Sequence, residues 1–370
     1  MKKFLYLFFI IFSLAFSTET YSEEEYISGK VISLISETKG EKSEGVDKIL
    51  KFQVEVLEGE EKGRIVELDF PVYIEQQYNF TTKVGDKVVL YKSFDFENSE
   101  EEMESTPIES IYISDIDKRG IFYTLFAIFI LTTLFVAKKK GSQSLIALLF
   151  TLIFIIKVFI PAVSKGYSPI LFAVLTCIFS TIITTFFITG FSKKSFTAIL
   201  GTTVGVAIAG ILSYGFANIM RLTGYADAEI LSYANIVSKI NLKELISAGV
   251  IIGSLGAVMD VAVSISSSIN ELYEHNPNIK TKTLFKSAMN IGNDIIGTMV
   301  NTLVLAYIGS SILTILLVYL QSSSYPIIRI LNYEDIATEI LRSICGSIGI
   351  LISVPVTSYI GTKIFKRKRS

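Results

Sequence analysis

The chain has 370 residues, of which 50% are hydrophobic and 19% are charged, with a formal net charge of −1. This composition is too apolar for an ordinary soluble domain. One histidine (His275) and two cysteines (Cys177 and Cys345) are too few for a soft-metal site of three or four ligands, and the scattered basic residues do not suggest a nucleic-acid surface.

The charge is divided unevenly along the chain. Residues 18–119 carry 25 acidic and 12 basic side chains, whereas residues 120–370 carry 10 acidic and 20 basic ones. This division predicts a water-facing domain joined to a membrane domain. Residues 1–17 combine lysines, an apolar run and small residues, which predicts a secretory signal peptide. An uncleaved signal anchor is the alternative, and it would export the next domain equally.

Residues 18–97 are predicted to form a small extracytoplasmic β-rich domain of barrel or sandwich type. Short β-rich runs alternate with turns, and in the middle two runs apolar side chains fall on every second residue. The runs cover residues 29–35, 51–56, 64–70 and 85–91. Residues 98–119, which begin with a dense acidic run, are predicted to be an acidic linker and juxtamembrane segment.

Seven apolar segments within residues 120–362 approach or exceed the length of about 20 residues that crosses a bilayer. They cover residues 120–137, 144–163, 169–189, 196–220, 245–269, 295–320 and 340–360. The predicted fold class is therefore an α-helical polytopic membrane protein of about seven transmembrane helices, with a β-rich domain in front. A basic tail follows at residues 363–370 and is expected in the cytoplasm.

The basic residues predict an orientation. If the β-rich domain is outside, the inner segments hold 13 lysines and arginines and the short outer segments hold 8. This excess predicts that the N-terminal domain lies outside and the C-terminus lies inside. The expected partners are the lipid bilayer, an ion or small solute, and a homo-oligomer or related membrane subunit. No nucleic acid and no cofactor are expected.

The fifth apolar segment carries an acid near the expected middle of the bilayer. Asp260 lies nine residues, or roughly 13 Å, before the inner end of the segment, and it shares one helical face with Ser264 and Ser267. Five glycines are predicted to let helices pack closely, namely Gly249, Gly253 and Gly256 in this segment and Gly201 and Gly205 in the fourth.

A second polar stripe lies at the start of the sixth segment. Its members recur at intervals of three and four residues, so one face holds Asn290, Asn293, Asp294 and Asn301. The predicted depth of Asp294 depends on the helix. A straight helix leaves Asp294 at the inner rim, whereas a break at residues 309–311 draws it into the membrane.

The oxygens of two facing stripes can bind a proton or a hard cation such as Na⁺, Mg²⁺ or Mn²⁺, although the sequence does not identify the metal. An acid inside a bilayer is costly, which favours a functional role for Asp260. The alternative is that these groups only hold helices together through hydrogen bonds.

Four stretches resemble a known family. They are residues 165–170, 190–194 and 253–262, and residues 289–307 with the sequence MNIGNDIIGTMVNTLVLAY, and they resemble the YibE/F family of bacterial multispan membrane proteins. The resemblance runs from about Gly120 to the C-terminal tail, and it implies a location in the bacterial plasma (inner) membrane. The family often has arginine where Asn293 stands, so an ion pair with Asp294 is not expected here.

The polar stripes support two hypotheses of function. The first is a secondary transporter or permease for an ion or small solute, with Asp260 and Asp294 as coupling acids and the asparagines as polar lining. The second is a non-transporting anchor or sensor whose β-rich domain binds a cell-envelope partner. An enzyme is not expected, because the Gly-x-Gly-Asp pattern of an intramembrane aspartyl protease is absent before Asp294.

Overall fold

A computed structural model describes residues 25–40, 45–59, 61–74, 80–95, 108–225, 239–321 and 326–366. The contacts divide the chain into two compact units: a front unit, Thr18–Thr132, and a helical unit that contains Thr133–Ser370. The predicted signal peptide, the acidic run at the start of the predicted linker and the last four residues of the tail lie outside the described residues.

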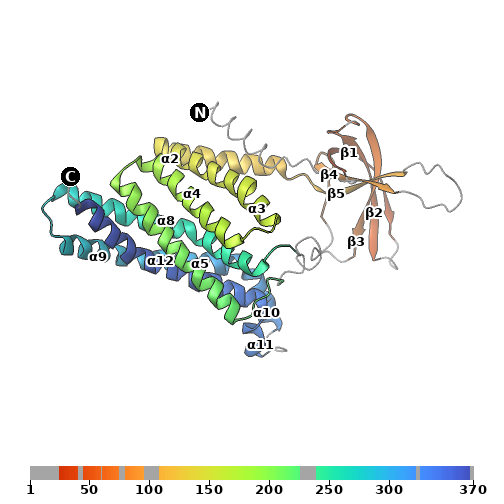
Figure 1. Ribbon diagram of the computed structural model, residues 1–370. Helices are drawn as coiled ribbons and strands as arrows, with labels where there is room; N and C mark the ends of the chain where they lie inside the picture. The colour runs from red at the N-terminus through yellow and green to blue at the C-terminus, as the bar shows by residue number, and fades with distance from the viewer. Residues whose placement is uncertain are drawn as a thin grey trace. The chain divides into compact units, whose positions relative to one another are not determined.

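The front unit holds a five-stranded antiparallel sheet in the order β3-β2-β1-β4-β5 (Figure 1). Its strands are β1 (Glu25–Lys39), β2 (Val46–Val56), β3 (Ile65–Tyr73), β4 (Lys87–Asp95) and β5 (Ile108–Ile116). The outer strands β3 and β5 also contact each other, so the sheet curves into a nearly closed barrel. The prediction of a β-rich domain of barrel type is therefore confirmed.

Side chains along each strand point alternately inward and outward, and the inward ones form the barrel core. Val31, Val54, Val56, Val88 and Leu90 are fully buried, because every second residue of a strand points to the same face. Shifts of register along β1, where it pairs with β2, mark bulges, and bulges increase the bend and twist of a strand.

Strand β5 lies within the stretch that the sequence analysis assigned to a linker. Its residues Ile111 and Ile113 pack against the barrel core, and β5 pairs with β4 over its whole length. The acidic residues before this strand dominate the local composition and hide the alternation. The four predicted runs overlap β1 to β4.

The helical elements begin with α2, whose residues fall in both units. They are α2 (Arg119–Phe154), η3 (Ile155–Phe159), α3 (Ile160–Ser164), α4 (Pro169–Thr189), α5 (Lys193–Ile219), α8 (Leu242–His275), α9 (Thr281–Ser310), α10 (Ile312–Gln321), α11 (Ile327–Leu331) and α12 (Glu334–Lys366). In the described residues, six helices are long and apolar enough to cross a membrane.

The first of these six candidate spans, Arg119–Ser164, contains two of the seven predicted segments. Its backbone leaves the helical region at Lys138, where φ is 47° and ψ is −125°. Next to this break, a Cβ on Gly141 would lie 2.6 Å from the carbonyl oxygen of Thr133, so only glycine fits there. The break separates the two segments, and the count of seven spans stays a prediction.

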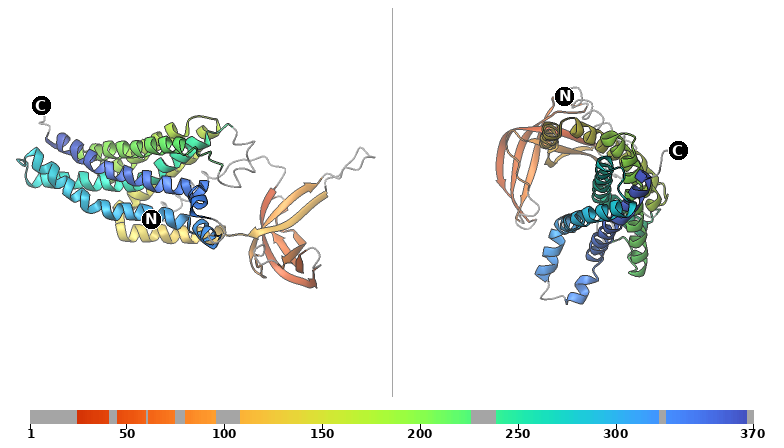
Figure 2. Two further views of the ribbon diagram at one scale, coloured as in Figure 1. Left: turned by 90° about the horizontal axis from the view of Figure 1, so that it is seen from below. Right: turned by 90° about the vertical axis from the view of Figure 1, so that its left-hand side faces the viewer.

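Helices α5, α8 and α12 pack closely against one another. A Cβ on Gly205 would lie 3.0 Å from the carbonyl oxygen of Gly349, and Gly201 faces Thr357 with no room for a side chain. Glycine lets two helix backbones approach, which is how helices associate where lipid replaces water. Helices α10 and α11 lie at the margin of the helical unit (Figure 2).

A small ionic network lies where β5 ends in the front unit. The carboxylate of Asp117, only 6% exposed, pairs with Arg119 at 2.8 Å and accepts a hydrogen bond from the Ser28 hydroxyl at 3.1 Å. Arg119 also reaches Glu58 at 3.2 Å. The hydrogen bond from the Arg119 guanidinium is the main reason that the pKa of Asp117 is lowered to about 2.

Replacing Asp117 with asparagine is expected to destabilise the front unit at neutral pH by about 1 to 2 kcal/mol, since Arg119 is half exposed and partly screened. The folded pKa lies below the unfolded value of about 3.9, so wild type loses this contribution as the pH falls from about 4 to 2. Hydrogen-exchange protection of the β1 and β5 amides in the detergent-solubilised chain measures both effects. The exposed Asp69→Asn is the control, and an unchanged pH dependence in Asp117→Asn would contradict the expectation.

Candidate functional site

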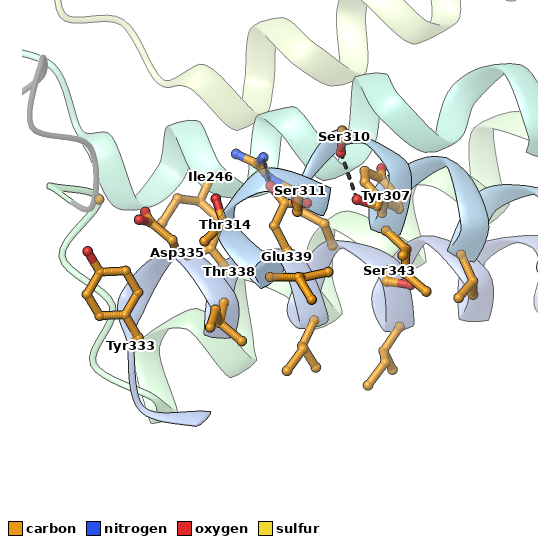
Figure 3. Close-up of a pocket in the computed structure, with 18 of the residues that line it drawn as sticks. Ile246, Tyr307, Ser310, Ser311, Thr314, Tyr333, Asp335, Thr338, Glu339 and Ser343 are labelled. Carbon is orange, nitrogen blue, oxygen red and sulfur yellow. Dashed lines mark hydrogen bonds and ion pairs between the residues drawn. The ribbon is translucent and has the colours of Figure 1, made fainter. Parts of the chain in front are cut away.

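A pocket of about 850 Å³ lies between α8, α9, α10 and α12, at the end of the helical unit where α8 and α12 begin and α9 ends. Figure 3 shows Asp335, Thr338, Glu339 and Ser343 following one another along α12. The remaining wall is mixed: Ser310, Ser311 and Thr314 contribute hydroxyls, and Ile246, Ile308, Ile336 and Ile340 contribute apolar surface.

An ion pair on α12 is the strongest polar feature of this pocket. Arg342 Nη1 lies 2.7 Å from Glu339 Oε1, and the two side chains are 34% and 25% exposed. Each of the two side chains also has a buried polar atom that the ion pair does not satisfy. Within the described part of the chain, Arg342 Nε and Glu339 Oε2 are buried and have no hydrogen-bond partner, and the same holds for Tyr307 Oη and Thr338 Oγ1. Buried polar atoms without partners are costly unless a ligand or water pairs with them.

Two glycines of α8 lie beside polar side chains of α9 and α12, and the contact at Gly253 is the tight one. A Cβ on Gly253 would lie 2.6 Å from Tyr307 Oη, and a Cβ on Gly249 would lie 3.8 Å from Arg342 Nη2. Two of the glycines predicted to serve helix packing therefore border the polar wall of the pocket. The third, Gly256, has no atom within 4 Å of a Cβ position.

The loop after α5 borders the pocket near the start of α12. Glu334 accepts hydrogen bonds from the backbone N–H groups of Thr223 at 2.6 Å and Gly224 at 2.7 Å. An acid in the first turn of a helix is also favoured by the helix dipole. These bonds fix the chain after α5 against α12, and Gly224 thereby becomes part of the pocket lining.

The residues that the sequence analysis selected lie outside this pocket. Asp260 and Ser264 are exposed on α8 and Ser267 is half-buried, while Asn290, Asn293, Asp294 and Asn301 are exposed on α9. Among the described residues, no side-chain hydrogen bond or ion pair joins the two stripes. The described part of the chain contains no group of three or more His, Cys, Asp or Glu that could hold a metal ion.

Two contacts between α8 and α9 show where the two polar stripes lie along these helices. At one end Gly253 meets Tyr307, and at the other a Cβ on Gly292 would lie 3.3 Å from Ile265. Asp260 lies between these contacts on α8, as Asp294 lies between them on α9. The helix also ends at Ser310, and α10 begins at Ile312, so the break considered from the sequence is present.

None of the residues that line the pocket was predicted from the sequence, and Tyr307, Glu339 and Arg342 are the three that matter most for its polar chemistry. The sequence does contain a signal for the ion pair, because Glu339 and Arg342 lie one helical turn apart near the start of the last apolar segment. Nothing in the sequence places Tyr307 beside them.

The sequence model described as YibE/F-like protein matches residues 125–367. The chain belongs to this YibE/F-like family. The family resemblance inferred from four stretches is thereby confirmed, and with its long apolar helices this YibE/F-like chain is a multi-span membrane protein. The matched residues leave out the five strands of the front unit. No curated protein and no solved structure matches the chain.

The pocket of this YibE/F-like chain offers both kinds of hydrogen-bonding group. Glu339 Oε2 can accept, Arg342 Nε can donate, and the Tyr307 hydroxyl can do either. The wall holds two acids, Asp335 and Glu339, against one base. This balance favours a cationic or zwitterionic molecule over an anion.

Gly253→Ala is expected to make this YibE/F-like protein less stable than Gly256→Ala, by about 1 kcal/mol, because the new methyl group must displace the Tyr307 hydroxyl at 253 and meets open space at 256. Both changes replace glycine with alanine in α8, so the gain in helix propensity cancels. Thermal unfolding of the two detergent-solubilised variants measures the difference. Equal midpoints would show that Tyr307 does not rest against Gly253.

Proposed function

We propose that this YibE/F-like chain is a secondary transporter or permease for an ion or small solute, and that the solute binds in the pocket between α8, α9, α10 and α12. The observation that carries the proposal is the Glu339–Arg342 pair with its unpaired buried atoms, placed on helices long enough to cross a membrane. Polar groups are costly within spanning helices and are typical of solute pathways.

A continuous face of α8 supports a link between the pocket and the acid predicted from the sequence. Gly249 borders Arg342 and Gly253 borders Tyr307, and Gly256, Asp260 and Ser264 follow at intervals of three or four residues. Asp260 lies seven residues beyond Gly253, which is about 10 Å along the helix. A proton or cation bound at Asp260 would therefore lie close to the inner end of the pocket.

In this proposal, one group of residues binds the solute and another couples its movement to an ion gradient. Glu339, Arg342 and Tyr307 bind the solute, whereas Asp260 is the coupling acid, with Ser264 and Ser267 as polar lining. The expectation that Asn290, Asn293, Asp294 and Asn301 share this role stays a prediction, because these residues are exposed on α9. In the proposed orientation, within a bacterial plasma membrane and with the front unit outside, α8 and α12 begin on the outer side. The pocket would then open toward the outside.

Proteoliposomes test the proposal under gradients of H⁺, Na⁺, Mg²⁺ and Mn²⁺, with labelled methylamine, glycine and acetate as cationic, zwitterionic and anionic solutes. The expected result is flux of a cation or of methylamine or glycine, which Glu339→Gln lowers at least about ten-fold, a change of about 1.4 kcal/mol. Glu271→Gln removes an exposed charge elsewhere on α8 and is expected to leave the flux intact.

Asp260→Asn separates coupling from binding. It is expected to abolish gradient-driven accumulation while the folded protein still exchanges solute across the membrane. Wild-type flux in Glu339→Gln would exclude the pocket as the route. No flux of any probe, beside a working control transporter, would favour the anchor or sensor hypothesis and direct the search to partners of the β-barrel.

A further inference from the structure

Helix α9 has one buried face and one open face. Leu284, Ala288, Gly292 and Leu303 are buried, and Gly292 meets Val354 of α12 as well as Ile265 of α8. A second row of residues is exposed and recurs at intervals of four, three and four: Asn290, Asp294, Gly297 and Asn301. We call this row the α9 seam.

The α9 seam has the spacing of a helix-pairing surface. Asn290 and Gly297 are seven residues apart, and so are Asp294 and Asn301, as in the two core positions of a heptad repeat. No atom lies within 4 Å of a Cβ position on Gly297, so another backbone can approach there. The chain's own helices use the other face of α9.

The polar side chains of the α9 seam are unfavourable in contact with the hydrocarbon of lipid. Asp294 and Asn301 lie between the two contacts that join α8 and α9, and α9 is one of the candidate spans. Amide and carboxylate groups at this level have no partner in hydrocarbon, and each unsatisfied group costs several kcal/mol. A protein surface with hydrogen-bonding groups at matching heights would satisfy them.

We propose that the α9 seam pairs with the α9 seam of a second copy of this chain, with the two helices parallel. An asparagine side chain both donates and accepts, so Asn290 and Asn301 can each pair with the same residue across a two-fold axis. Two copies inserted in one direction have parallel helices, and parallel helix pairs accommodate asparagine at a core position. The proposal stands whether or not the chain transports a solute.

Cysteine cross-linking of the full-length chain in its own membrane is the first test. Asn301→Cys is expected to give an oxidant-induced dimer, whereas Thr302→Cys, exposed on α9 but one residue away from the seam, is expected to give little. The native Cys177 and Cys345 are buried, so the unmodified chain supplies a clean background. Equal cross-linking at 301 and 302, or none at 301, would overturn the proposal, as would cross-linking of 301 only to another protein.

Two substitutions test the chemistry of the seam by light scattering of the detergent-solubilised protein. Gly297→Ile blocks the close approach and is expected to weaken dimerisation by roughly ten-fold or more, which corresponds to about 1.4 kcal/mol. Asp294→Asn replaces two facing carboxylates with amides and is expected to keep or increase the dimer fraction. A dimer unaffected by Gly297→Ile, or one lost in Asp294→Asn with the fold intact, would contradict pairing through this row.

Discussion

The close packing of α5, α8 and α12 is the constraint on which the rest of the helical unit depends. Apolar side chains gain little by leaving lipid for protein, so helices in a membrane associate through contact at short range. Here the backbones approach at Gly205 and Gly349, where a Cβ on either glycine would lie 3.0 Å from the other's carbonyl oxygen. At Gly361 the side chain of Ile269 from α8 fills the space, since its Cδ1 would lie 2.6 Å from a Cβ position. These three helices form the fixed frame of the unit.

Helices α9 and α10 lie beside the frame of α5, α8 and α12. This arrangement produces both the pocket and the α9 seam. One wall of the pocket belongs to the frame, because Glu339 and Arg342 lie on α12 and Arg342 lies beside Gly249 of α8. The other wall belongs to α9 and α10, which include Tyr307, Ser311 and Thr314. A site between a fixed group of helices and a less buried pair is suited to the proposed transport, since alternating access moves one group of helices against another. The outward face of α9 then remains for a partner.

The sequence predicted what depends on local pattern. Helix α4 has the predicted bounds, residues 169–189, because a long apolar run between turn residues is read directly from hydropathy. Strand β5 was missed because its acidic neighbours mask the alternation. Helical periodicity showed that Asp260 and Ser264 share a face, but it could not show what that face meets, and the structure leaves both exposed. The pocket was missed for the same reason: Tyr307 lies more than 30 residues before Arg342, and only the tertiary packing joins them.

The proposed transport requires that the pocket among the spanning helices opens to the outside, so that water and solute can enter it. Reaction of Ser310→Cys with a membrane-impermeant maleimide in intact cells tests it directly, because a thiol reacts as its thiolate and that form requires water. Leu317→Cys, half exposed on the apolar helix α10, serves as the lipid-facing control. The account predicts rapid labelling at 310 from outside and little at 317. Labelling at 310 only after the cells are permeabilised, or at neither position, would contradict it.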